Sequence, residues 1–552
     1  MIKKIIKHPL SYILLFAFLI RIVMIKYGLP FWLYNDEPPF VLTTLKMFQL
    51  KTLLPVLHEA DFKPFMYYPP YISYLYIPFF LFSIALSWIG FDGNLSELQN
   101  VLASDPSIFF LTARVIMIFI STLTIYLIYK ITQSLTQSKT ASLYSAILSS
   151  TSLMFISLSI TGKHWVPILF FYTLCLFILT RPNWSIKKRY IFSVITVGIG
   201  TGISTIVILF SVVIFLWYIT YDKVSIKESL TSLFMYKLGF IVAILSFIPV
   251  LLYPASLGFV PDTTLHGGKT LLGFITSPFV FPFPFIATEP VLVLLSLIGL
   301  YLGLKKYKPF YVTSIIFTVF YSMIFYVFFR FEYRFLLPLV LFLTIGSAIG
   351  INEIRNKYPN KYSKIFIYLI LLIPILFSLR LSYLGYTNDS RIKAKEWLNA
   401  NAEAHDKVIV YANLMRIANN KSGILEQQFI DAKSLRTNDK NMLSIRDGLI
   451  KEKTFHALNL YTVENDNFYK MIDVYVKKNG YKYLIFSKRD FLDKPEQFEY
   501  VKNLTKDAKL IVSYGNNESN YSLSKTEIGP SLLPFFRINE FGPEIEIYKL
   551  ND

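Results

Sequence analysis

The chain has 552 residues, of which 54% are hydrophobic, 17% aromatic and only 16% charged. Ordinary soluble domains carry about 25% charged residues, so this composition argues against a purely soluble protein. Repeated apolar runs of about 17–25 residues instead predict membrane spans. The net charge of +19 could indicate nucleic-acid binding, but most Lys and Arg outside the C-terminal part lie in short loops between apolar runs. We therefore expect contact with membrane lipids and no nucleic-acid partner. The single cysteine, Cys175, excludes an intrachain disulfide and a cysteine-based zinc cluster.

The first apolar run, 9–27, follows Lys3, Lys4 and Lys7 and precedes no small-residue cleavage site. We expect a retained first span with its N-terminus in the cytoplasm, which places the loop 28–107 on the outer face. Within this loop, 38–54 predicts a short amphipathic helix on the membrane surface. The run 71–90 is long enough to span. However, the acidic segment 91–107 and the lysines after the next run favour a segment that lies along or re-enters the outer face.

Later apolar runs alternate with loops, and basic residues gather in every second loop, at 181–189, 223–227, 305–308 and 355–364. This positive-inside pattern predicts about 11 spans in all and an extracytoplasmic C-terminus. The run 190–221 is too long for one straight span, and its glycines predict a break or hairpin. The outer loop 254–287 contains Asp262, His266, Lys269 and a proline-rich stretch that cannot form an ordinary continuous helix. The predicted later spans are 108–130, 141–161, 165–180, 190–204, 206–221, 232–253, 288–304, 309–329, 335–351 and 365–383.

From about residue 388 the composition changes, because charged residues and Asn become frequent and long apolar runs stop. Residues 391–399 predict a helix with Ala394, Trp397 and Leu398 on one face. Strands are expected at 407–411, 481–486, 510–514 and 544–548. We therefore divide the chain into a membrane domain, 1–387, and an extracytoplasmic α/β domain, 388–552.

Residues 33–40, Leu-Tyr-Asn-Asp-Glu-Pro-Pro-Phe, place two adjacent carboxylates, Asp36 and Glu37, where a membrane protein meets water. One interpretation is a solvated acidic pair that caps the surface helix. The other is a general base or a metal ligand, because a carboxylate at this boundary can reach a polar acceptor and a lipid-borne donor together. The residues alone leave both interpretations open.

Other features follow in a fixed order. A Tyr-Tyr-Pro-Pro-Tyr corner lies at 67–71, Arg114 begins the next long span, and Arg-Phe-Leu-Leu-Pro enters a late span at 334–338. With the outer Asp-Glu pair and the C-terminal domain, this order resembles the GT-C glycosyltransferases, specifically glycosyltransferase family 39, which includes protein O-mannosyltransferases and lipid A aminoarabinose transferases. The resemblance covers about residues 8–385. It implies the GT-C membrane fold and a multi-pass location in the cell membrane.

The resemblance also implies transfer of a hexosyl or pentosyl group from a polyprenyl- or dolichyl-phosphate carrier to an acceptor on the outer face. Asp36 matches the family's first-loop carboxylate, the proposed base, with Glu37 supporting it. A carboxylate can take the proton of an acceptor hydroxyl as the glycosyl bond forms, and Arg is suited to hold the leaving phosphate. The acceptor class stays open among a protein hydroxyl, a glycolipid and a cell-wall glycan.

Cationic side chains are the candidates for the phosphate site. Arg334 is the better match to the family, and Arg330 lies close to it in sequence; the alternative is interfacial snorkelling of both side chains with Glu332 as ion partner. Lys63, in Asp-Phe-Lys-Pro, is a second candidate. We expect Arg114 to be structural and to hold the outer end of its span.

The sequence departs from the family pattern at two places. Tyr68 precedes the Pro-Pro pair, where family members often carry a His or an acidic residue. The short second outer loop reads Thr-Gly-Lys-His-Trp at 161–165 and lacks the Asp that many members carry there. Lys163 and His164 could bind phosphate or orient the acceptor, or simply form a charged turn. A divalent metal stays possible, although we predict no metal ligand. Three earlier side chains fit no established ligand pattern and are expected to be solvated: His58, Glu59 and Asp61.

The sequence thus predicts a polytopic α-helical GT-C glycosyltransferase with a C-terminal α/β domain. Asp36 and Glu37 are the predicted catalytic residues. The predicted substrate-binding residues are Lys63, Tyr68, Lys163, His164, Arg330 and Arg334. Two other functions compete. A transporter or lipid flippase would need charged residues near the midplane or repeated halves, and a membrane receptor would use the C-terminal domain to bind a ligand.

Overall fold

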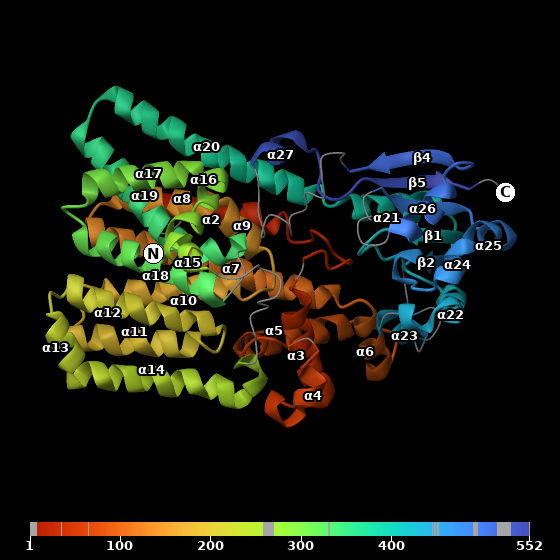
Figure 1. The fold of residues 1–552 in the computed structure, drawn as a ribbon, viewed down its shortest axis with the longest axis horizontal. Coiled ribbons are helices and arrows are strands. Elements are labelled where there is room, and N and C mark those ends of the chain that lie inside the picture. The colour runs from red at the N-terminus through yellow and green to blue at the C-terminus, as the bar shows by residue number, and fades with distance from the viewer. Residues whose placement is uncertain are drawn as a thin grey trace.

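The computed structural model describes residues 8–34, 36–64, 66–257, 270–328, 332–435, 437–443, 445, 449, 452–488, 495–515 and 532–550. Figure 1 shows a bundle of helices with a small β-sheet and its own helices at one end. The short helix α13 (Ile226–Thr231) lies at the opposite end of the bundle. It follows Lys223 and contains Lys227, so this predicted inside loop lies far from the sheet.

Seven helical segments in the described ranges are long and apolar enough to cross a membrane, and counting two bent pairs as single spans raises this to nine. The fold is therefore a multi-pass helical membrane protein, as predicted. The seven are α5 (Tyr71–Trp88), α7 (Ser107–Thr136), α14 (Leu233–Leu252), α15 (Leu271–Val280) with α16 (Pro284–Thr288), α18 (Lys308–Phe328), η5 (Tyr333–Leu336) with α19 (Leu337–Lys357), and α20 (Lys361–Tyr386). The bent pairs are α3 (Pro38–Leu50) with η1 (Pro55–His58) and α4 (Glu59–Phe62), and α8 (Lys139–Thr151) with α9 (Leu153–Ser159). Shorter apolar helices are α2 (Pro9–Ile22), α10 (Trp165–Leu179), η2 (Thr205–Phe210) with α12 (Ser211–Thr220), and α17 (Pro290–Gly303).

The glycine-rich break predicted within 190–221 is confirmed. Helix α11 (Ile186–Gly200) ends there, and the chain returns through η2 and α12. Gly202 lies in this turn, where its carbonyl accepts a hydrogen bond from Tyr71 N (3.0 Å). A Cβ on Gly202 would lie 2.0 Å from the Tyr71 ring, so only glycine allows the turn to approach the start of α5 this closely.

The prediction of a loop over residues 254–287 is partly wrong. After η3 (Pro254–Leu257), the described residues from Leu271 form α15 and α16. Pro284 occupies the first turn of α16, where a missing N–H costs no hydrogen bond, and Pro278 lies inside α15. The prolines therefore divide the segment into two helices instead of excluding helices. These two helices together are long and apolar enough to cross a membrane, so they add a candidate span to those predicted. Asp262, His266 and Lys269 lie outside the described residues.

The first outer loop is helical, as expected, but its packing differs from the expectation. Helix α3 begins with Pro38 and Pro39 and ends at Lys51, which adopts a left-handed conformation. Its apolar residues Phe40 and Val41 join the main core and contact α5 through protein packing. These side chains are thus covered by protein, whereas we had expected them to face the membrane. Helix α6 (Leu95–Ser104) follows α5 and packs against it.

The C-terminal part forms a five-stranded sheet of order β2-β1-β3-β5-β4. The first three of these strands are parallel, and β5 pairs antiparallel with β3 and β4. The four predicted strands are confirmed, and β2 is an addition. The strands are β1 (Lys407–Tyr411), β2 (His456–Asn459), β3 (Tyr483–Ser487), β4 (Lys509–Tyr514) and β5 (Ile545–Lys549). The helices are α21 (Ser390–Asn401), which confirms the predicted helix, α22 (Lys421–Ile430), η6 (Ala432–Ser434), α23 (Thr437–Leu443), η7 (Leu460–Thr462), α24 (Asp466–Lys470), α25 (Ile472–Asn479), α26 (Pro495–Asn503) and α27 (Leu532–Arg537).

Each face of the sheet contributes apolar side chains to a separate buried core. The first outer loop covers part of one of these faces. Because side chains alternate along a strand, Ile409 and Tyr411 of β1 join the core beside α25 and α26. Val408 and Val410 join the other core, which includes α21 and, from the first loop, Phe31 and Leu33. The chain after α2 is also fixed by hydrogen bonds from Tyr27 Oη to Asp389 Oδ2 (3.1 Å) and from Gly28 N to Asn388 Oδ1 (3.0 Å). The segment that carries Asp36 and Glu37 is thus held between the helices and the sheet.

Candidate functional site

Glu37 and Arg114 anchor the first loop. The Glu37 carboxylate is fully buried and accepts two hydrogen bonds from Arg114, at 2.8 Å from Nε and 2.6 Å from Nη2. Nη1 of the same arginine donates to the carbonyls of Ile25 and Tyr27, each at 2.8 Å. Arg114 therefore ties the amino-terminal part of α7 to the chain before and after Tyr34. This agrees with the structural role expected for Arg114.

Gly162 brings the second outer loop onto this anchor. Its N–H donates to Glu37 Oε1 (2.7 Å), and its carbonyl accepts from Tyr76 Oη (2.9 Å). A Cβ at this position would lie 3.0 Å from Ala113 Cβ, which is tight for any side chain. A small residue here lets the 161–165 turn rest directly on Glu37 and α7.

Asp36 turns away from this anchor. Its backbone is left-handed, with φ of 60°, an uncommon conformation for a residue with a side chain. The carboxylate, 47% exposed, accepts a hydrogen bond from Nη1 of Arg334 (2.6 Å). Glu37 precedes α3 but makes no side-chain capping bond to it, so the capping interpretation does not describe this pair. The two neighbouring carboxylates face different partners, Glu37 in the core and Asp36 at the surface.

Arg334 lies between two carboxylates. It enters from η5 with its side chain 10% exposed, and Nη2 contacts Glu332 Oε2 (2.5 Å) while Nη1 contacts Asp36. The guanidinium carbon lies 5.7 Å from the centre of the Phe335 ring. The ion partner Glu332 that we considered is thus present, but Arg334 also reaches Asp36, 298 residues away in sequence.

Lys163 and His164 complete the cluster around Asp36. Both side chains are buried, and the charge of Lys163 acts on Asp36. Burial raises the pKa of Asp36, but Arg334 and then Lys163 outweigh this effect, so the pKa lies below its usual value. Burial, assisted by Arg334 and Lys163 and opposed by Asp36, holds the pKa of His164 well below its usual range. At neutral pH the cluster therefore contains an ionised Asp36 and a neutral imidazole.

Aromatic rings surround His164. Its ring centre lies 4.3 Å from that of Tyr68, 5.0 Å from Phe40 and 4.7 Å from Trp165. Tyr68 stacks on Phe40 at 5.0 Å. Neither imidazole nitrogen has a hydrogen-bond partner within the described ranges. The Tyr-Pro-Pro corner and the second loop thus meet beside Asp36.

The charges around Asp36 do not suit a divalent cation. Mg²⁺ and Ca²⁺ prefer sets of oxygen ligands, whereas Asp36 has Arg334 and Lys163 as charged neighbours. In the part of the chain that the structure describes, no group of three or more His, Cys, Asp or Glu is arranged to hold a metal.

Two predicted substrate-binding residues are not placed with Asp36. Lys63 is exposed at the end of α4, where its backbone N–H donates to the carbonyl of Glu59 (2.9 Å). Arg330 lies outside the described residues. Asp61 pairs with Lys46 (3.6 Å) and His58 (3.9 Å) on an exposed surface, as expected for a solvated group.

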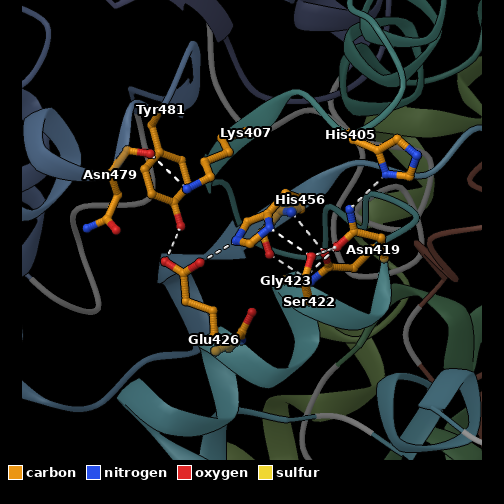
Figure 2. Close-up of polar contacts among 12 residues, drawn as sticks. His405, Lys407, Asn419, Ser422, Gly423, Glu426, His456, Asn479 and Tyr481 are labelled. Carbon is orange, nitrogen blue, oxygen red and sulfur yellow. Dashed lines mark hydrogen bonds and ion pairs between the residues drawn. The ribbon is translucent and has the colours of Figure 1, made fainter.

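A second polar cluster lies in the C-terminal part, at the amino ends of the parallel strands. Figure 2 shows Glu426 between Tyr481 and His456, with Ser422 on the far side of the imidazole. Glu426 accepts from Tyr475 (2.6 Å), Tyr481 (2.7 Å) and His456. Burial opposes ionisation, but these hydrogen bonds lower the pKa of Glu426 to about 2. Ligands of such sheets bind at the carboxyl ends of parallel strands, so we assign this cluster to the stability of the domain.

Sequence reasoning missed Gly162 and Phe40 as parts of the site. Gly162 appeared only as a member of the second loop, although a glycine in a short turn between two spans is a signal for close approach. Phe40 was assigned to a surface helix, and its contact with His164 depends on a fold that brings positions 40 and 164 together.

Comparison with known proteins gives fold-level likeness alone. No protein-family model matches this chain, and no curated protein matches it in sequence. Among solved structures, the archaeal oligosaccharyltransferase AglB from Archaeoglobus fulgidus, in complex with an inhibitory peptide and a dolichol-phosphate, is 13% identical with a TM-score of 0.45 over 93% of this chain and 74% of that chain. ArnT from Cupriavidus metallidurans bound to undecaprenyl phosphate is 9% identical with a TM-score of 0.42 over 98% and 97%. The arabinofuranosyltransferase AftD from Mycobacteria is 11% identical with a TM-score of 0.36 over 81% and 34%.

These neighbours include an oligosaccharyltransferase and an arabinofuranosyltransferase. The chain covers 65% of the AglB chain that is tethered to an acceptor peptide. Every one of these TM-scores lies below 0.5, so the likeness identifies neither substrate nor catalytic residues. The function proposed next rests on the residues around Asp36.

Proposed function

We propose that this chain is a GT-C membrane glycosyltransferase, which moves a sugar from a polyprenyl-phosphate carrier to an acceptor on the extracytoplasmic face. One observation carries the proposal. A half-exposed carboxylate, Asp36, contacts a largely buried arginine, Arg334, and lies beside Lys163 and a neutral His164. Glycosyl transfer from a lipid phosphate needs a proton acceptor and cations for the leaving phosphate at one site.

Arg334 and Lys163 are proposed to bind the donor phosphate. Arg334 contacts Asp36 and Glu332, and Lys163 lies beside Asp36, so basic and acidic side chains match in number. A donor phosphate would take part of the hydrogen bonding of Arg334 from Asp36. The bound phosphate would also offset the positive charges that lower the pKa of Asp36. Donor binding therefore makes Asp36 a stronger base for the step that follows.

The transfer itself is a displacement at the anomeric carbon. The acceptor hydroxyl oxygen forms a bond to this carbon while the bond to the phosphate oxygen breaks, and the polyprenyl phosphate leaves with the electron pair. The hydroxyl proton passes to Asp36 as the new bond forms. Arg334 and Lys163 stabilise the charge on the leaving phosphate. No oxidant, reductant or metal enters this balance.

The surrounding residues position these groups. Glu37 is enclosed by Arg114 and Gly162 and therefore fixes the loop without touching substrate. His164, held against Tyr68, would present a neutral nitrogen to a sugar or acceptor hydroxyl after a small movement of its aromatic neighbours. Residues 388–552 are proposed as an extracytoplasmic domain, since their sheet packs on the outer-loop residues Phe31 and Leu33.

The test uses the purified chain in lipid nanodiscs with a panel of radiolabelled polyprenyl-phosphate sugars. Release of polyprenyl phosphate is measured for the wild type, for Asp36→Asn and for Asp61→Asn, a matched change in the same loop outside the cluster. We expect release from at least one donor, about 100- to 10,000-fold slower release with Asp36→Asn, and little change with Asp61→Asn. Equal rates for all three proteins would reject Asp36 as the base. Failure to bind or turn over any carrier would reject the transferase.

A further inference from the structure

A cavity of about 780 Å³ lies between the first outer loop and the C-terminal domain. Its volume is in the range of small-molecule sites in proteins. Three parts of the chain line it: the segment 30–32, the end of α5 together with α6, and residues 395–452. The catalytic role proposed above does not account for this cavity.

Trp32 forms a fixed part of the cavity wall. Its ring stacks on Phe110 at 5.3 Å, and the guanidinium of Arg416 lies 4.2 Å from its centre. Its backbone has a φ of 54°, an uncommon conformation for a bulky residue that recurs at functional sites. The flanking residues Phe31 and Leu33 are buried in the core of the sheet. Contacts with both the helical part and the C-terminal part of the molecule therefore hold this wall in place.

The charge of the cavity is opposite to that of the whole chain. Among the lining residues that the structure describes, there are four carboxylates and two cations, Lys395 and Arg416. Lys395 pairs with Glu452 at 2.6 Å, and the other described charges of the lining are Arg416 and three carboxylates: Asp92, Asp105 and Asp439. The chain as a whole carries +19. A phosphorylated or otherwise anionic ligand is thus disfavoured here, in contrast to the cations beside Asp36.

We infer that this cavity binds a neutral saccharide and that the transferase uses it to hold a glycan acceptor. A sugar ring combines apolar C–H faces with a rim of hydroxyl donors. The cavity supplies apolar contacts from α6, such as Leu98 and Leu102, and carboxylates that accept hydrogen bonds from hydroxyls. This acceptor assignment rests on the proposed function, whereas the binding itself does not.

The cavity and the Asp36 site are both built on the first outer loop and α7. Trp32 lies four residues before Asp36 on the same loop. Phe110, which stacks on Trp32, lies about one helical turn before Arg114 on α7, and Arg114 holds Glu37. A saccharide held beside Trp32 would thus contact the same loop that carries the carboxylate proposed to activate it.

The experiment measures saccharide binding and carrier release separately on the full chain in nanodiscs. Saturation-transfer NMR reports binding of mannotriose, chitotriose and maltotriose, with trigalacturonate as an anionic trisaccharide and Lys-Ser-Lys as a cationic peptide. Release of radiolabelled polyprenyl phosphate is followed with and without each compound. The variants are Asp92→Asn with Asp439→Asn, and the matched control Asp473→Asn, an exposed change on α25.

We expect at least one neutral trisaccharide to bind and to accelerate carrier release, and trigalacturonate to bind at least fivefold more weakly. The double variant should raise the Kd for that trisaccharide at least fivefold, and Asp473→Asn should leave it unchanged. Binding of Lys-Ser-Lys alone, or of none of the compounds, would overturn the inference while carrier turnover still supported the proposed function. Saccharide binding with no turnover of any carrier would instead overturn the proposed function and, with it, the acceptor assignment.

Discussion

Arg334 shares its guanidinium between Asp36 and Glu332, so a bound phosphate must compete with two carboxylates. Arg334→Lys keeps the charge but loses the planar pair of donors. We predict that it weakens binding of polyprenyl phosphate by about 10- to 100-fold, because a hydrogen bond to a charged group contributes about 1.5–3 kcal/mol. Equilibrium binding of a radiolabelled carrier in nanodiscs measures this. Arg189→Lys is the matched control, since Arg189 pairs with Asp222 (2.7 Å) outside the site. Equal loss in both variants would show a general effect on the fold.

His164 provides a prediction on pH. Its pKa is lowered well below the usual value, so in the folded protein it stays neutral while an unfolded histidine would take a proton near pH 6.5. Its contribution to stability is therefore complete above about pH 6.5 and is lost as pH falls from there towards the folded pKa. We expect the rate of transfer to show no transition near pH 6.5 between pH 5 and 8. A pH–rate profile of the wild type beside His164→Asn checks this. A wild-type transition near pH 6.5 that is absent from the variant would contradict it.

At the scale of the element, the Glu37–Arg114 pair joins the first loop to α7. Removing one partner of a buried ion pair leaves an uncompensated charge, which costs about 3–5 kcal/mol. We predict that Arg114→Met lowers the free energy of unfolding of the nanodisc-bound protein by about 3–5 kcal/mol, as measured by thermal unfolding. Adding Glu37→Met should recover most of this loss. Lys306→Met, which breaks an exposed pair with Glu353, should cost less than about 1 kcal/mol. No recovery in the double variant would show that the pair is not the cause.

The elements were largely predictable from sequence, and their partners were not. Apolar runs and glycines were sufficient to predict most spans and the break after α11, because burial in lipid imposes long apolar helices. The strand β2, only four residues long, offers too little alternation to be recognised. The contact between Asp36 and Arg334 joins positions 298 residues apart, and no local pattern encodes it. The family resemblance suggested both residues, whereas the role of Gly162 emerged only from the packed structure.

At the scale of the whole molecule, the first loop completes the core of the C-terminal sheet. Phe31 is 1% exposed in this core, and a Phe→Ala change in a core costs about 3–5 kcal/mol. We predict that Phe31→Ala destabilises the C-terminal sheet by this order and exposes the loop to proteolysis. Phe429→Ala, at a residue 91% exposed, should change stability by less than about 0.5 kcal/mol. Limited proteolysis with thermal unfolding compares the two variants. Equal resistance of the two variants to proteolysis would show that the stability of the sheet does not depend on the first loop.

Which residues of the first loop the sheet packs on could not be predicted from the sequence. The composition change near residue 388 showed where the apolar runs stop, but the alternation of Phe31, Trp32 and Leu33 gave no sign of which neighbour each side chain meets. In the structure Phe31 and Leu33 face the sheet, whereas Trp32 faces α7 and Arg416. Such contacts depend on how the first loop lies against the C-terminal sheet. The periodicity of the sequence within either part does not predict this.

The central claim is that Asp36 takes the acceptor proton while Arg334 holds the donor phosphate. Single-turnover release of polyprenyl phosphate by Asp36→Asn, measured at saturating donor together with direct binding of the donor, tests it most directly. The account predicts release slower by at least about 100-fold. It also predicts donor binding that is unchanged or tighter, because Asp36 no longer competes for Arg334. Unchanged release, or a loss explained entirely by weaker donor binding, would contradict it.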